Sequence, residues 1–166
     1  MKKMLVVYYS WSNGNTKRIA EKLASETGTD IASIETTTPY KGSYEEVVDQ
    51  GKREVEAGFM PEINSLPVNI SDYEAIAIGT PTWWYTMAPA VLTFLTTHDF
   101  KGKTVIPFMT NGGWPGHVIK DMKEKCKGAE FMHEMQIQFD SMGKDHLETP
   151  EHEIDKWIER IKEDLK

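Results

Sequence analysis

Apolar residues along the chain follow two different spacings, which predict strands and helices in alternation. Continuous apolar runs predict strands buried on both faces of a sheet, at residues 3–9, 30–35, 73–79, 103–109 and 135–139. Apolar residues repeated every three or four positions predict helices at residues 15–27, 44–57, 89–97 and from 114 or 115 to 127, and a last helix that Thr149 caps and Pro150 opens. The alternation predicts an α/β protein with a three-layer, doubly wound, five-stranded parallel sheet. Pro107 lies inside the fourth predicted strand and lacks a donor N–H group, so we expect a bulge or irregularity there.

Length and composition place further limits on the class of protein. A chain of 166 residues is long enough for a full core, and we expect a single domain over residues 1–166. The net charge of −7 opposes binding to nucleic acid, and no apolar run approaches the length of a membrane span. The one cysteine, Cys126, cannot form an internal disulfide, which favours the cytoplasm. Its helical surroundings predict a packed thiol rather than a catalytic one.

The loop after the first predicted strand, residues 10–16, combines hydroxyl, amide and glycine residues without a charged side chain. A turn that closes a strand and opens a helix directs backbone N–H groups and the positive end of the helix dipole at one point, which suits a phosphate. The predicted phosphate ligands are Ser10, Ser12, Asn13, Gly14, Asn15 and Thr16. An ordinary capped turn is the alternative. The loop matches neither the P-loop nor the dinucleotide-binding pattern, and its neutral donors suit a phosphomonoester without a metal ion.

The loop after the third predicted strand places three aromatic residues in succession, at Trp83, Trp84 and Tyr85. Consecutive rings cannot all face one core, so at least one is expected to line a pocket or a surface. A flat ring system such as a flavin could stack on them, and the predicted contact residues are Thr80, Pro81, Thr82, Trp83, Trp84 and Tyr85. Packing beneath the loop or a protein interface is the alternative.

The loop after the fourth predicted strand contains three glycines and a histidine. Residues Thr110, Asn111, Gly112 and Gly113 would bring backbone N–H groups to the edge of a ligand ring and stabilise negative charge on it. His117 is the candidate catalytic residue, and a solvated side chain at the start of a helix is the alternative. All three loops leave carboxyl ends of strands, where doubly wound sheets bind ligands, so they predict one site.

With these loops placed, the chain resembles the flavodoxin family, most closely its short single-domain members. The resemblance covers nearly the whole chain and depends on Tyr8 to Ser10 leading into Gly14 to Thr16, on Gly79 to Trp84, and on Met109 to Gly113. It implies strand order 2-1-3-4-5 and non-covalent binding of FMN, with residues 10–16 on the phosphate and residues 80–85 and 111–113 flanking the isoalloxazine ring. The first loop is one residue longer than is usual in the family, which leaves open whether Ser12 or Asn13 contacts the phosphate.

The resemblance implies a redox protein, and one feature of the sequence favours two-electron chemistry. Residues 82–85 contain no glycine, so a backbone carbonyl beside the flavin cannot flip at low cost to support one-electron transfer. We therefore expect two-electron reduction of a quinone-like or other small acceptor, as in an FMN-dependent NAD(P)H oxidoreductase. A one-electron carrier that serves a separate reductase is the alternative, and a flavin-free interaction module is the alternative from another class. The expected partners are a redox protein or NAD(P)H with a small acceptor, and the expected state is a monomer or homodimer.

Overall fold

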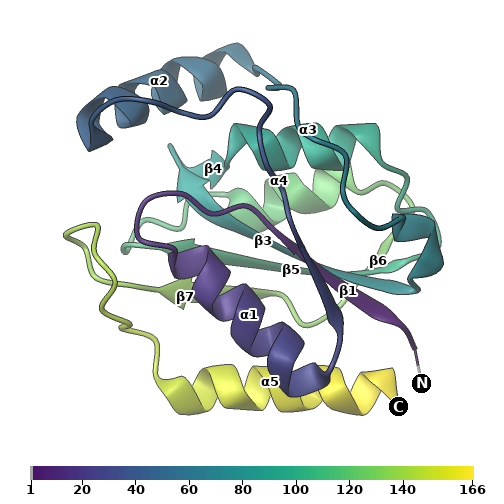
Figure 1. Cartoon of the computed structure of the whole chain (residues 1–166). Coiled ribbons are helices and arrows are strands. Elements are labelled where there is room, and N and C mark those ends of the chain that lie inside the picture. Colours follow the sequence, from purple (N-terminus) through teal and green to yellow (C-terminus); the bar gives the residue numbers. More distant parts are fainter. Residues whose placement is uncertain (1) are drawn as a thin grey trace.

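A parallel sheet forms the centre of the protein, and helices join its strands across both faces (Figure 1). The computed structural model describes residues 2–166. The strands are β1 (Met4–Tyr8), β2 (Asp30–Ser33), β3 (Ala75–Trp83), β4 (Thr86–Met87), β5 (Thr104–Asn111), β6 (Glu130–Phe131) and β7 (Met135–Gln138). They lie in the order β2, β1, β3, β5, with β6 and β7 both paired to the outer side of β5 and β4 paired antiparallel to β3. The predicted α/β class is confirmed, and the strand order differs only in detail because the sequence did not predict β4 and β6.

Within residues 2–166, two layers of α-helices cover the sheet. They are α1 (Asn15–Thr27), α2 (Tyr44–Ala57), α3 (Pro89–Thr97), α4 (Val118–Lys125) and α5 (Glu151–Leu165), with a short 3-10 turn at Ile70–Asp72. Helices α1 and α5 cover one face, and α3 and α4 cover the other, with α2 beyond α3 (Figure 1). Alternate residues of β1 serve the two layers: Val6 packs in the cluster with α1 and α5, and Val7 in the cluster with α3 and α4. None of these helices is both long and apolar enough to span a membrane.

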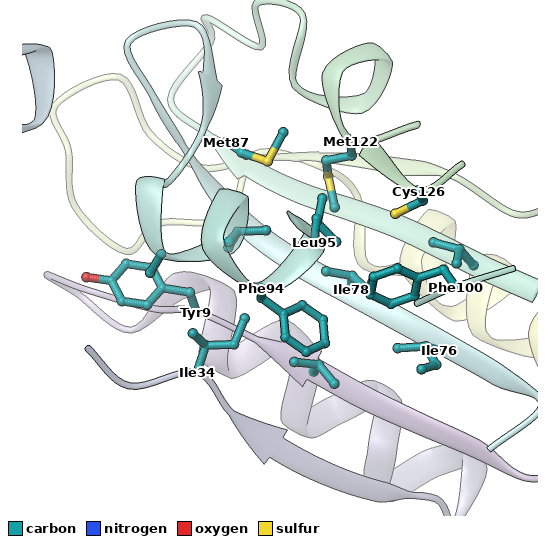
Figure 2. Packing of buried hydrophobic residues seen from close by; sticks show 14 of the residues in the cluster. Tyr9, Ile34, Ile76, Ile78, Met87, Phe94, Leu95, Phe100, Met122 and Cys126 are labelled. Atoms are coloured by element: carbon teal, nitrogen blue, oxygen red, sulfur yellow. The ribbon is translucent and has the colours of Figure 1, made fainter. Parts of the chain in front are cut away.

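The core between the sheet and helices α3 and α4 contains the cysteine. Figure 2 shows Phe94 and Phe100 in this cluster. Their rings pack edge to face, with centroids 5.6 Å apart. Cys126 belongs to the same cluster and is 1% exposed. Burial raises the pKa of its thiol to about 12, because the thiolate would lose its hydration. The prediction of a packed thiol is confirmed.

The irregularity expected at Pro107 lies in the neighbouring strand. Pro107 keeps its register with Ile78 of β3, so β5 itself continues without a bulge on that side. On the other side, β6 pairs up to Val105 and β7 begins pairing at Phe108. Val105 O points toward the gap between β6 and β7, because it accepts a hydrogen bond from Met132 N. Backbone groups two residues apart point to the same side of a strand, so the nitrogen of Pro107 also points toward this gap. The N–H group that Pro107 lacks therefore lies where pairing with β5 is interrupted between β6 and β7.

Two helices begin later than the sequence predicts. Helix α4 begins at Val118 instead of residue 114 or 115, because Gly116 is left-handed (φ 57) and His117 N donates to Tyr85 O. Helix α5 begins at Glu151, with Pro150 at the N-cap position. Thr149 is not the cap, because its hydroxyl accepts a hydrogen bond from Gln138 N at 2.7 Å. Both starts are set by contacts with distant segments, which the local pattern does not contain.

Candidate functional site

A cavity of about 280 Å³ opens at the carboxyl ends of the strands. The loops after β1, β3 and β5 line it together, and helix α2 and the segment after β7 complete it. Figure 1 shows these parts gathered at one end of the sheet. The lining residues are Trp11, Ser12, Asn13, Asn15, Thr16, Tyr44, Val47, Val48, Gly51, Pro81, Thr82, Trp83, Trp84, Thr110, Asn111, Gly112, Phe139, Asp140, Gly143 and Lys144.

The first loop presents backbone N–H groups at the start of α1. Gly14 is the N-cap residue in the left-handed conformation (φ 74), and it has no side chain to cap the helix. Arg18 N donates to Gly14 O, and Lys17 N donates to Ser10 Oγ at 3.3 Å. The N–H groups of Asn15 and Thr16 therefore point out of the helix end, where they and the helix dipole favour an anion.

Three polar residues that line the cavity, Asn15, Thr16 and Thr110, have buried oxygen atoms. The hydroxyls of Thr16 and Thr110 are hydrogen-bonded at 2.8 Å, and both residues are buried. Asn15 Oδ1 is buried without a partner among the described residues. A buried carbonyl oxygen without a donor is costly, so this atom marks a position where a bound hydroxyl or N–H group would be stabilised.

Aromatic rings form one wall of the cavity. The Trp83 ring meets Tyr9 and Tyr40 edge to face, with centroid distances of 6.0 and 5.1 Å. Trp11 stacks on Tyr44 with centroids 5.8 Å apart, so α2 and the first loop join the same wall. Desolvation raises the pKa of the Tyr9 and Tyr40 hydroxyls above the ordinary tyrosine value, which keeps both neutral. The aromatic side chains that line this wall, Trp11, Tyr44, Trp83 and Trp84, are uncharged, which suits a flat aromatic ligand.

Strands β3 and β4 form a hairpin whose two-residue tip is Trp84 and Tyr85. Both residues have positive φ, 49° and 69°, which identifies a type I′ turn, usually built from Asn-Gly. Left-handed backbone costs a non-glycine residue about 1–3 kcal/mol. The tip is therefore strained, and its neighbours must hold it.

Contacts from both sides hold this tip in place. On the side of α2, Trp84 Nε1 donates to Val48 O at 2.9 Å. On the side of α4, His117 N donates to Tyr85 O at 2.8 Å. Gly116 approaches the tip so closely that a Cβ there would lie 2.2 Å from Tyr85 O. The hairpin tip is thus clamped between α2 and the loop before α4.

The candidate catalytic residue lies beside the hairpin and not in the cavity. The His117 side chain is 59% exposed, and its Nδ1 pairs with Asp121 Oδ2. The same carboxylate oxygen accepts a hydrogen bond from the Thr86 hydroxyl at 2.6 Å. His117 therefore contributes to the clamp on the hairpin through both its backbone and its carboxylate partner.

The structure brings most of the residues proposed from the sequence to the cavity and leaves a few outside it. Those that do not line it are Ser10, Gly14, Thr80, Tyr85, Gly113 and His117. Thr80 is fully buried, and its hydroxyl accepts from Ala88 N while it donates to Pro81 O, so it holds the base of the hairpin. Gly113 N donates to Asn111 Oδ1 at 2.7 Å and so shapes the third loop.

Sequence reasoning missed the contributions of α2 and of the segment after β7. The missed lining residues are Trp11, Tyr44, Val47, Val48, Gly51, Phe139, Asp140, Gly143 and Lys144. A usable signal existed at Gly51, a glycine inside a predicted helix, where a Cβ would lie 3.0 Å from the Trp83 ring. Within residues 2–166 no group of three His, Cys, Asp or Glu side chains converges to hold a metal ion.

Comparisons with known proteins identify the family. The sequence matches the flavodoxin family model over residues 3–161. The chain is similar to a "putative flavoprotein" from Bacteroides eggerthii, with 30% identity, coverage of 97% of this chain and 98% of that chain, and a TM-score of 0.77. It is also similar to a flavoprotein from Lactobacillus acidophilus in complex with FMN, with 24% identity, coverage of 95% and 99%, and a TM-score of 0.71. No match is found among curated proteins. The chain belongs to the flavodoxin family.

Proposed function

We propose that this protein binds FMN in the cavity and uses it for two-electron reduction of a quinone-like or other small acceptor. Three observations support the cofactor. The N–H groups of Asn15 and Thr16 suit its phosphate, the orphaned Asn15 Oδ1 suits a hydroxyl of its ribityl chain, and the uncharged aromatic wall suits its ring. The solved flavoprotein from Lactobacillus acidophilus, described as a complex with FMN, adds support by similarity.

The residues that would hold FMN divide into two groups. The first loop and the start of α1 would hold the phosphate with neutral donors. Trp83 and Trp84 would contact the ring, and Asn111 and Gly112 would bring backbone groups to its edge. The cavity volume of about 280 Å³ is close to the roughly 300–1,000 Å³ that is typical of ligand sites.

Bound FMN supplies a centre that accepts a hydride or single electrons, and the hairpin tip favours the hydride. Rotating the Trp84–Tyr85 peptide would convert the type I′ turn into type II′, whose first central position is normally glycine. Trp84 occupies that position, and the contacts from Val48 and His117 hold the tip on both sides. Reorienting this peptide would therefore be costly, which disfavours one-electron chemistry.

The test is an anaerobic reductive titration of the purified protein, preceded by its absorbance spectrum. We expect a yellow protein that releases FMN on denaturation, that is reduced in a single two-electron step, and that oxidises NAD(P)H when a quinone is present. Accumulation of one-electron-reduced flavin without NAD(P)H oxidation would identify a one-electron carrier instead. Failure to bind FMN would refute the proposed function and leave an interaction module that uses the Trp83 and Trp84 surface.

A further inference from the structure

The segment from Asp140 to His146, which we call the strap, follows β7 and is closed on itself by one carboxylate. The Asp140 side chain accepts hydrogen bonds from the backbone N–H groups of Met142, Lys144 and His146 at 3.0, 3.0 and 2.9 Å. Asp140 N in turn donates to His146 O at 2.8 Å. Most N–H groups of the strap are thus satisfied internally, and the carbonyl groups of Gly143, Lys144 and Asp145 are left to accept hydrogen bonds from other parts of the protein.

Side chains from the first loop and α1 bind three successive carbonyl groups of the strap. Asn13 Nδ2 donates to Gly143 O, Asn15 Nδ2 donates to Lys144 O at 2.9 Å, and Arg18 Nη1 donates to Asp145 O at 3.3 Å. The pairing joins positions about 130 residues apart in the sequence. The strap is therefore fastened to the same helix start that presents free N–H groups to the cavity.

The strap also reaches α2 on the far side of the cavity. A Cβ added at Gly143, which is left-handed (φ 76), would lie 3.3 Å from the Tyr44 hydroxyl. Tyr44 stacks on Trp11 of the first loop. Gly143 and Lys144 both line the cavity, so the strap crosses its edge from α1 to α2.

The strap carries the positive charge of the site. Lys144 is the one cationic residue among the described lining residues, and its ammonium group has no carboxylate within 4.0 Å in residues 2–166. The one acidic lining residue, Asp140, is already bound to three N–H groups of the strap. A lining residue with an unpaired ammonium group, together with the free N–H groups at the start of α1, suits a ligand with an anionic end.

We propose that the strap closes over the phosphate end of the cofactor, that Lys144 pairs with the phosphate, and that the side chains of Asn13 and Asn15 fasten the strap. This inference depends on the proposed binding of FMN. It assigns the phosphate to the backbone N–H groups of the first loop and to Lys144, and it removes the side-chain amides of Asn13 and Asn15 from the set of phosphate ligands. Retention of the cofactor then depends on a segment that follows the last strand.

The first experiment compares FMN with riboflavin, which lacks the phosphate. Dissociation constants are measured for the wild type, for Lys144→Gln and for Lys17→Gln, a matched control that removes an exposed charge near the same helix end without touching the cavity. We expect Lys144→Gln to weaken FMN at least about tenfold while riboflavin binding stays unchanged. We expect Lys17→Gln to change either by less than about threefold, because Lys17 does not line the cavity and its charge would act on the phosphate only through solvent. Equal losses for FMN and riboflavin, or equal effects of the two lysines, would overturn the assignment.

The second experiment measures hydrogen exchange of peptides that cover residues 140–146. We expect FMN to slow exchange in the strap and riboflavin to have little effect, and we expect Asn15→Ala to raise exchange there in the unliganded protein. Unchanged exchange in Asn15→Ala would refute its role as a fastener. If the wild type binds neither FMN nor riboflavin, the proposed function fails. If it binds both, but FMN and riboflavin have the same effect on hydrogen exchange in the strap, this inference alone fails.

Discussion

Replacing Gly116 with alanine tests the clamp on the hairpin tip. The new Cβ would lie 2.2 Å from Tyr85 O and 2.5 Å from Tyr85 Cα, where ordinary contact begins at 3.4 Å, so the tip or the loop must move by about 1 Å. Overpacking of this kind costs about 1–3 kcal/mol, and the left-handed conformation (φ 57) costs alanine about 1–2 kcal/mol more. The sum, about 2–5 kcal/mol, is a large part of the roughly 5–15 kcal/mol that stabilises a typical protein.

The assay is urea unfolding of Gly116→Ala beside Gly58→Ala. Gly58 is also left-handed (φ 64), but a Cβ there would have nothing within 4 Å, so this control carries the conformational cost alone. The difference between the two variants therefore isolates the clash with Tyr85. If Gly116→Ala is destabilised no more than Gly58→Ala, the loop before α4 does not press on the tip and the reasoning about the clamp is wrong.

Three further predictions concern the cavity and the core. Thr16→Glu should abolish FMN binding, because a carboxylate would repel the phosphate and the hydrogen bond to Thr110 would be lost. A fluorescence titration measures FMN binding, and the unfolding free energy of the apoprotein is the control for misfolding. Replacing both Trp83 and Trp84 with alanine should weaken FMN binding about 2- to 10-fold per ring and raise flavin fluorescence. If neither the affinity nor the fluorescence changes, these rings serve only packing or an interface. Cys126 should resist alkylation at pH 8 and react once the protein is unfolded in urea, since its pKa of about 12 keeps the thiol protonated; rapid native labelling would contradict this burial.

The strands of the central sheet could be predicted because the necessary signals are local, whereas their order came from the resemblance to the flavodoxin family. Apolar runs such as residues 4–8 belong to single elements, and helix α1 has the predicted bounds, with apolar residues toward the core and Gly28 at its end. The three loops could be placed at one site because a parallel sheet brings the carboxyl ends of its strands together. The strap could not be placed this way, because its contacts with Asn13 and Asn15 join opposite ends of the chain.

The same reason explains the errors at element ends. The start of α4 depends on Tyr85 O, a group more than thirty residues away in sequence that takes the N–H group of His117. Thr149 is a residue type that often caps helices, but its hydroxyl accepts a hydrogen bond from Gln138 N instead. Local sequence identified the residue types at these positions, and tertiary contacts determined the hydrogen-bond partner of each one.

The interruption between β6 and β7 has a consequence for the behaviour of the protein at high concentration. An uninterrupted edge strand exposes a row of N–H and C=O groups on which a strand of another molecule can add. Here one edge consists of a two-residue and a four-residue strand separated beside Pro107, and the opposite edge, β2, has four residues. Neither edge offers a long template, so intermolecular strand addition is discouraged at both, and crowding should not convert the native sheet into fibrous aggregates.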